Sequence, residues 1–554
     1  MSTSTLGEAW SGFNFYEFNW YNVCMDNFGY WSRGKERLLL LILIALAVFL
    51  YAGFSFGLPW RFNSPDEAAN AFFSQRVAQG QKLAAPAELN EITVNPIVHP
   101  RSTQLVQGKL APASFLGLPL IVGAIGRVLG QGVLPYVTPL LAALGLGCFF
   151  FIVRGLSGQR PAVLATVLLA MTPAFWYYHS RSFFHNALFF DFLLLAVCLL
   201  FQAVKTKKAW VYLVAGLALG LTLSLRTSEI FWMTAAGLVW LGLNWRQVKW
   251  RYLWLLILGV LISFSPVLVT NYHIYGSVLS VGYRQDLLLA GDLKQAMGLL
   301  SQLVLPFGFH PRVILATATN YLVELTWWWT VLAGAGIVYL LAIWRRLSRP
   351  AKSFAVALLV VCGWLVVVYG SWQFNDNPDP SATTLGTSYV RYWLPIYGFL
   401  LWPASLALAR LTERKWGKEF ILALVGCYAV LSALLVWWEP AEGLAQVRAN
   451  VQRFEVWAGE VRALTEPESV IVTGMTDKLF WPERKVIYDL VNPADYEAVG
   501  KLLAWGTPVY WFHPTWFQDD FNYVNQRLSA FGLSLWPRQY GWQDFSLYKF
   551  VPVP

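Results

Sequence analysis

Two adjacent carboxylates, Asp66 and Glu67, stand near the start of this 554-residue chain, in the stretch NSPDEAAN at residues 63–70. The order Ser64-Pro65 followed by Glu67 is typical of a helix start, with Ser64 as N-cap and Glu67 closing a capping box. On this interpretation the two carboxylates only complement the positive end of the helix dipole. The alternative is chemical, because an ionised Asp66 beside a substrate hydroxyl or amine acts as a general base.

Cationic, imidazole and aromatic side chains recur in short polar stretches between long apolar runs. Each has a plain interpretation. A cation at a membrane surface contacts lipid head groups, and a histidine there is hydrogen-bonded. Arg226 pairs with Glu229 on a helix, and Arg391 extends its charged group from the apolar span to the membrane surface. Taken together around a loop with paired carboxylates, they predict a base that faces an anion-binding cradle. The candidates are His99, Arg101, Lys109, Arg181, His185, Arg226, Tyr283 and Arg391.

The composition bounds the class of protein. Hydrophobic residues make up 57% of the chain, charged residues 13%, and tryptophan occurs 29 times. A soluble core does not hide so much apolar surface, so these values indicate a polytopic membrane protein. The net charge of +10 comes from short basic clusters between apolar runs, which membrane topology explains without nucleic acid. The 5 cysteines have neither disulfide nor metal-ligand spacing, so no cofactor is expected, and a divalent metal stays open as an unsupported alternative.

Eleven apolar stretches approach the ~20 residues that cross a bilayer, and the charges between them predict the topology. The basic clusters, from the one at Arg33 to the one at Arg410, fall on one side, which is predicted to be cytoplasmic together with the N-terminus. This holds only when residues 112–131 lie along the outer surface. The predicted spans are 38–57, 134–153, 161–178, 186–204, 209–225, 229–244, 252–270, 316–344, 353–371, 392–410 and 419–437.

The opposite side receives a large first loop, residues 58–133, and the tail from residue 438. The tail has the mixture of polar and apolar residues that is typical of a soluble domain. It contains a helix-like stretch at 441–465 and strand-like runs at 469–472, 508–512 and 546–550. We therefore expect a mostly α fold. A polytopic transmembrane helix bundle occupies residues 1–437, with surface helices in its first outer loop, and a small α/β domain occupies residues 438–554 outside the membrane.

Several short motifs in this order carry a resemblance to a known family. They are Pro65-Asp66-Glu67-Ala68, Leu225-Arg226 after a Gly-rich apolar run, Tyr275-Gly276-Ser277 through Gly282-Tyr283, and Arg391-Tyr392-Trp393-Leu394-Pro395, similar to an Arg-Tyr-x-x-Pro opening of a late span. The combination resembles the GT-C superfamily of membrane glycosyltransferases, which includes protein O-mannosyltransferases and the aminoarabinose transferases of lipid A. The resemblance covers residues 38–437.

The resemblance implies an enzyme that moves a hexosyl or pentosyl group from a polyprenyl-phosphate donor to an acceptor at the outer face, with inversion. Asp66 would deprotonate the acceptor and Glu67 would orient the site. Cationic side chains would neutralise the leaving phosphate without a metal. By this resemblance the donor phosphate would be bound by Lys109, Arg226 and Arg391. From their places in the outer loops, Arg101 is a further candidate for the phosphate, and His99, Arg181, His185 and Tyr283 are candidates for substrate contacts.

The chain also departs from the family pattern. Asn70 stands where many relatives have Tyr, Lys109-Leu110-Ala111-Pro112 replaces a Lys-Pro pair, and His185-Asn186 replaces a turn that often carries a carboxylate. The sugar and the acceptor, whether protein, lipid or glycan, therefore stay unassigned.

Two other classes of protein compete with a transferase. A transporter or flippase of lipid-linked sugars also has many spans and intramembrane charges, but it more often shows two halves with matching broken spans. A non-catalytic scaffold would use the tail to bind a partner, and Asp66 would then be only a capping residue. The expected location is a prokaryotic cytoplasmic membrane, which the chain crosses several times, with membrane lipids as neighbours and no nucleic acid as partner.

Overall fold

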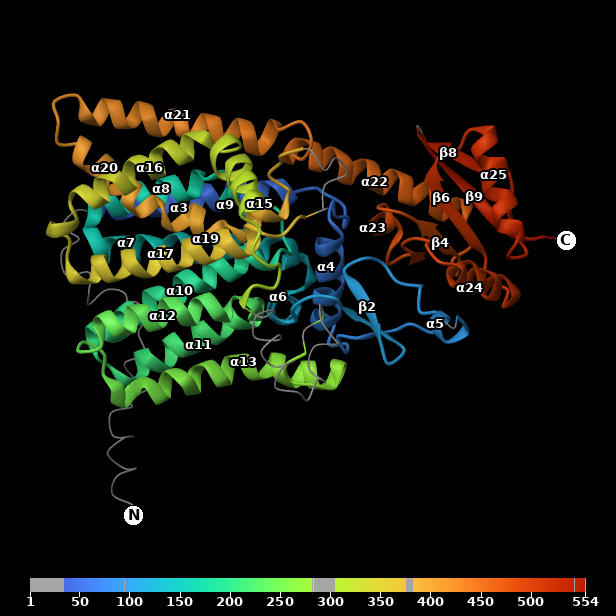
Figure 1. The fold of residues 1–554 in the computed structure, drawn as a ribbon, viewed down its shortest axis with the longest axis horizontal. Coiled ribbons are helices and arrows are strands. Elements are labelled where there is room, and N and C mark those ends of the chain that lie inside the picture. The colour runs from blue at the N-terminus through green and yellow to red at the C-terminus, as the bar shows by residue number, and fades with distance from the viewer. Residues whose placement is uncertain are drawn as a thin grey trace, which may run out of the picture.

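The computed structural model describes residues 34–93, 95–280, 282, 304–374, 382–542 and 544–553. A bundle of long helices runs side by side, and a mixed sheet lies beyond one end of it (Figure 1). The bundle contains α3 (Gly34–Ser55), α7 (Val137–Ser157), α8 (Gln159–Met171), α9 (Pro173–Ser180), α10 (His185–Thr206), α11 (Ala209–Leu225), α12 (Ile230–Asn244), α13 (Leu253–Tyr275), α15 (Pro311–Ala318), α16 (Trp327–Ala342), α17 (Arg349–Gly370), α18 (Ser388–Tyr392), α19 (Leu394–Phe399), α20 (Leu401–Leu411) and α21 (Gly417–Trp438).

The chain has several helices that are long and apolar enough to cross a bilayer. Among the described residues there are 6, or up to 9 when each bent pair counts as one span. The predicted total of eleven stays a prediction, because it counts α11 and α12 separately and includes α3, whose apolar part Leu40–Ser55 is shorter.

Two of the predicted spans differ in shape from straight helices, and two others meet at a sharp angle. The one at 161–178 is bent by 55° between α8 and α9, where Thr172 adopts an extended conformation ahead of Pro173, as the residue before a proline prefers. A π-helical turn, η6 (Thr319–Glu324), precedes α16, and the two halves there meet at 99°. Helices α11 and α12 meet at 116° across the turn η3 (Thr227–Glu229).

The first loop forms a small layer across the end of the bundle (Figure 1). Helix α6 has 13 residues, too few to cross the bilayer at ~1.5 Å per residue. It lies against α4 at Gly123, where an added Cβ would stand 2.5 Å from the Val77 Cβ atom and 2.7 Å from the Ser74 carbonyl oxygen. The layer comprises α4 (Pro65–Ala78), β1 (Ala85–Pro86), α5 (Leu89–Ile92), β2 (Thr103–Val106), β3 (Lys109–Pro112), α6 (Gly117–Leu129) and η2 (Gln131–Tyr136), with the strands in the order β1-β3-β2.

The tail begins with α22 (Leu444–Leu464), which leads from the bundle to a six-stranded sheet ordered β5-β4-β6-β9-β7, with β8 paired to β9. β4 is parallel to β5 and β6, and all four of its residues are buried, as in a strand covered on both faces. The predicted helix and strands coincide with α22, β4, β6 and β9. The remaining bounds are β4 (Val470–Thr473), α23 (Asp477–Phe480), β5 (Lys485–Ile487), α24 (Pro493–Ala504), β6 (Val509–Pro514), α25 (Gln518–Ser529), β7 (Leu533–Leu535), β8 (Tyr540–Trp542) and β9 (Phe545–Pro552).

The tail contacts the first loop through both charged and apolar groups. The buried Arg61 guanidinium lies 2.7 Å from carboxylate oxygens of both Glu455 and Glu483. The amide of Asn95 donates to Asp495 at 2.8 Å. Apolar residues of α4 and of the α23 region share one buried cluster. The segment that carries Asp66 is therefore packed between the bundle and the tail.

Candidate active site

Asp66 lies in the first turn of α4, and the local sequence explains its position. The Ser64 hydroxyl accepts from the Asp66 amide at 3.3 Å, and the Ser64 amide donates to Glu67 Oε2 at 3.0 Å. This is the predicted capping box, with Pro65 at the first helical position. Because the cap fixes the helix start, the Asp66 side chain projects from a defined point at the end of the bundle.

Both carboxylate oxygens of Asp66 accept hydrogen bonds from outside α4. The Ser102 hydroxyl donates to Oδ1 at 2.6 Å, and Arg391 Nη1 donates to Oδ2 at 2.9 Å. Burial by itself raises the pKa of Asp66, but the charge of Arg391, the hydrogen bonds from Ser102 and Arg391, and the nearby His185 together bring this pKa below its ordinary value. Asp66 is therefore ionised at neutral pH. An ionised carboxylate keeps lone pairs for a further donor.

Glu67 faces away from Asp66 into a buried ion pair. Arg181 donates to both of its carboxylate oxygens, through Nε at 3.1 Å and through Nη2. The remaining Nη1 group donates to the Tyr177 hydroxyl at 2.6 Å, and the guanidinium lies 5.0 Å from the centre of the Phe184 ring. This bidentate geometry fixes the plane of the guanidinium, so Glu67 holds Arg181 in place.

Asn70 lies one turn after Asp66 and connects α4 to the bundle. Its side-chain amide donates to the Phe183 carbonyl at 2.9 Å and lies 3.4 Å from His185 Nδ1. His185 Nε2 lies 2.9 Å from the Phe115 carbonyl, so Nε2 carries the proton and Nδ1 accepts from Asn70. Phe183 has a φ of 68°, a conformation that surrounding contacts must hold. Asn70, which departs from the family pattern, supplies one of these contacts.

Arg391 and Arg226 both lie close to one aromatic ring, that of Tyr392. The Tyr392 ring centre is 5.6 Å from the Arg391 guanidinium and 4.4 Å from that of Arg226. Arg391 also donates to the Ser388 hydroxyl at 2.7 Å. Arg226 is buried and donates to Glu229, Asn186 and Tyr369 at 2.8, 3.3 and 3.0 Å, respectively. The predicted pairing of Arg226 with Glu229 is thus present, and the guanidinium is fully engaged within the bundle.

The other predicted site residues have different surroundings. Arg101, expected at the donor phosphate, instead forms an ion pair with the buried Asp477 of the tail. Lys109 is exposed at the start of β3, beside the turn that follows β2. His99 Nδ1 lies 3.0 Å from the Pro100 carbonyl. Tyr283 is outside the described residues. Of the predicted set, the structure brings Asp66, Glu67, Arg181, His185 and Arg391 together.

Four side chains that take part in this arrangement were not among the predicted site residues. They supply hydrogen-bonding groups to the predicted residues, and no local motif distinguishes them from ordinary loop or helix positions. They are Asn70, Ser102, Tyr177 and Ser388. Within the described part of the chain, no three His, Cys, Asp or Glu residues are placed to hold a metal ion together.

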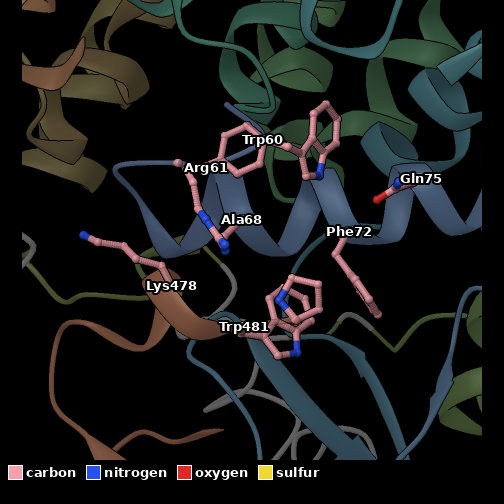
Figure 2. A pocket seen from close by; sticks show the side chains of 9 residues that line it. Trp60, Arg61, Ala68, Phe72, Gln75, Lys478 and Trp481 are labelled. Carbon is pink, nitrogen blue, oxygen red and sulfur yellow. The ribbon is translucent and has the colours of Figure 1, made fainter. Parts of the chain in front are cut away.

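The opposite face of α4 lines two hollows. The first lies between α4 and the tail, and Figure 2 shows Trp60, Phe72 and Trp481 around it. The second, with a volume of about 240 Å³, lies between α4 and η2 and shares Trp60 and Gln75 with the first. Asp66 lines neither of them.

Comparison with known proteins adds the following. A family model described as dolichyl-phosphate-mannose-protein mannosyltransferase matches residues 123–269, from α6 into α13. The structure is similar to ArnT from Cupriavidus metallidurans bound to undecaprenyl phosphate, with a TM-score of 0.53, 13% identity, and 92% of this chain and 98% of that chain covered. It is also similar to ArnT in the apo state, with a TM-score of 0.51, 12% identity, and 93% and 98% covered.

A third similar structure is the apo oligosaccharyltransferase of Archaeoglobus fulgidus, with a TM-score of 0.50, 12% identity, and 87% of this chain and 70% of that chain covered. A search of curated proteins gives no match. The fold is shared along nearly the whole of ArnT. The resemblance to the GT-C superfamily of membrane glycosyltransferases that the sequence predicted is confirmed.

Proposed function

We propose that this protein transfers a sugar from a polyprenyl-phosphate donor to an acceptor at the outer face of a membrane, with Asp66 as the general base. One observation carries the proposal. Asp66 is a partly exposed carboxylate, kept ionised by Arg391 and Ser102, at the start of a helix that crosses the end of the bundle. Similarity to ArnT bound to undecaprenyl phosphate supports the class of donor.

The reaction follows from the groups around Asp66. The acceptor hydroxyl or amine donates a hydrogen bond to the carboxylate and loses its proton to it as the acceptor atom attacks the anomeric carbon. The bond from that carbon to the phosphate oxygen breaks on the opposite side, so the configuration inverts and polyprenyl phosphate leaves. General-base assistance of this kind is worth ~10²–10⁴ in rate.

Cations near Asp66 balance the charge that develops on the leaving phosphate. Arg391 contacts Asp66 directly, and Arg181 lies on the neighbouring carboxylate. Cations placed where negative charge grows lower the barrier without rearrangement. We assign the phosphate to Arg391 first, with Arg181 and the exposed Lys109 as further contacts. We propose that Arg226 acts indirectly, through the Tyr392 ring that it shares with Arg391. Arg101 binds Asp477 of the tail and is not assigned to the phosphate.

The membrane arrangement completes the proposal. The end of the bundle that carries α4 and the tail faces the outside, and the predicted basic clusters face the cytoplasm. Residues 1–437 form the transmembrane part and residues 438–554 form a domain outside the membrane.

The test uses membranes that contain the wild type or Asp66→Asn, supplied with a panel of radiolabelled polyprenyl-phosphate sugars. One donor should be consumed by the wild type, and Asp66→Asn should reduce its transfer by ~10²–10⁴. The labelled product identifies the acceptor class. Equal transfer by both proteins would show that Asp66 is not the general base and serves only at the start of the helix. Donor that crosses the membrane without reaction would indicate a transporter instead.

A further inference from the structure

Helix α23 of the tail lies against both chain segments that meet at Asp66. One segment leads into α4, and the other, Arg101 and Ser102, leads into β2. We infer that Asp477 is a positioning residue for Asp66, acting through Arg101 and Ser102, so that the tail completes the candidate active site. This inference rests on the proposed function.

The first step is the contact between Asp477 and Arg101. Asp477 Oδ2 accepts from the Arg101 amide at 2.8 Å, while Oδ1 accepts from Nε at 3.0 Å and from Nη2 at 2.6 Å. The Asp477 side chain has 0% exposure. Arg101 Nη2 also donates to the Met475 carbonyl at 2.6 Å, and the guanidinium lies 5.0 Å from the Tyr488 ring centre. The tail therefore fixes the backbone of Arg101 as well as its side chain.

The second step is from Arg101 to Ser102. Ser102 has a φ of 58°, in the left-handed region that a residue with a Cβ atom rarely adopts. Such a conformation persists only when its neighbours hold it. On one side the Arg101 amide is bound by Asp477, and on the other the Ser102 carbonyl accepts from the Ala113 amide at 3.1 Å. In this conformation the Ser102 hydroxyl reaches Asp66 Oδ1 at 2.6 Å.

The same helix also contacts the chain just ahead of the Asp66 helix. Lys478 donates to the carbonyl of Asn63, the residue before the Ser64 cap. Trp481, directly after α23, packs on Phe72 of α4 with ring centres 4.3 Å apart, and Figure 2 shows this contact. Consecutive residues of the tail thus hold the start of α4 and the partner that hydrogen-bonds to Asp66.

The arrangement has a consequence for the proton affinity of Asp66. Its neighbours are Ser102, Arg391 and His185, and the first two stabilise the ionised form by hydrogen bonds. Loss of the Asp477 carboxylate releases Arg101, lets Ser102 relax, and weakens the bond to Oδ1. The pKa of Asp66 then rises, and its carboxylate is less well placed to accept the proton of the acceptor. A small misplacement of a reacting group costs up to ~10²-fold in rate.

The experiment measures transfer against pH for full-length wild type, Asp477→Asn, Ser102→Ala and the double variant. Asn95→Ala, which removes a different contact between the first loop and the tail, is the matched control. Both single variants should lower kcat about tenfold or more and move the acidic limb of the profile to higher pH, with little change in KM for the donor. The double variant should resemble Ser102→Ala, because Asp477 acts through Ser102. Asn95→Ala should leave the profile unchanged.

Amide hydrogen exchange on the same proteins gives a second result that does not require turnover. Asp477→Asn should speed exchange in peptides that cover residues 64–70 and 99–105, and Asn95→Ala should not affect residues 64–70. An active wild type with additive effects of Asp477→Asn and Ser102→Ala would overturn the inference, as would unchanged exchange in Asp477→Asn. A wild type that transfers no sugar would refute the proposed function, and the exchange result would then decide the positioning role.

Discussion

The buried pair of Glu67 and Arg181 gives a quantitative test of how the site is built. Their side chains are 5% and 2% exposed, respectively. Removing one partner of a buried ion pair costs about 3–5 kcal/mol, because the other charge stays unpaired. Glu67→Gln keeps one acceptor oxygen, and Arg181 keeps the Tyr177 hydroxyl, so we expect a loss near the lower end, about 3 kcal/mol.

The double variant Glu67→Gln with Arg181→Met shows how much of this loss comes from leaving one charge unpaired. Because both charges are then absent, the loss should fall to about 1 kcal/mol, which is about 2 kcal/mol less than the loss expected for Glu67→Gln alone. Glu483→Gln is the matched control, since Arg61 retains Glu455 and the loss should stay below about 1 kcal/mol. The free energy of unfolding is measured by denaturant titration in detergent. A Glu67→Gln protein as stable as the wild type would refute the assignment of Glu67 as the partner of Arg181.

Two further predictions follow from other contacts. Arg391→Met removes the charge and the donor that lower the pKa of Asp66, so the acidic limb of kcat/KM should move to higher pH; a profile that stays in place would show that Arg391 does not set the ionisation of Asp66. Gly117→Ala places a Cβ atom 2.0 Å from the Ser224 carbonyl oxygen, whereas nothing lies within 4 Å of such an atom at Gly147. Gly117→Ala should therefore lower stability by ~1–3 kcal/mol and Gly147→Ala should not, as thermal unfolding midpoints will show.

Much of the architecture was predictable because it depends on local pattern. The long apolar runs and the capping box at Ser64 are properties of neighbouring residues, and helices occur where they were expected. The bend at Thr172 and Pro173 has a local cause as well. The 99° bend ahead of α16 has no sequence signal of this kind.

The candidate site was predictable only in part. Asp66, Glu67 and Arg391 stood out because charges beside apolar runs are rare. Their partners could not be assigned, since Ser102 and Arg181 reach them across 36 and 114 residues of chain, respectively. The pairing of Arg101 with Asp477 spans 376 residues. A surface arginine that binds a phosphate and one that docks a distant carboxylate look the same in sequence.

The place of β9 in the sheet has a consequence for biosynthesis. β9 pairs with β6, β7 and β8 and lies between β6 and β7, yet it follows every other described element in the order of translation. β7 and β8 therefore cannot join the sheet until β9 is present, and in the proposed topology β9 must first cross the membrane. Since α23 also follows the bundle in the chain, its contacts with Asn63 and Arg101 form only after the bundle has been synthesised. A nascent chain that ends before α23 thus has Asp66 without the contacts from Asp477 and Lys478 that hold the segments around it.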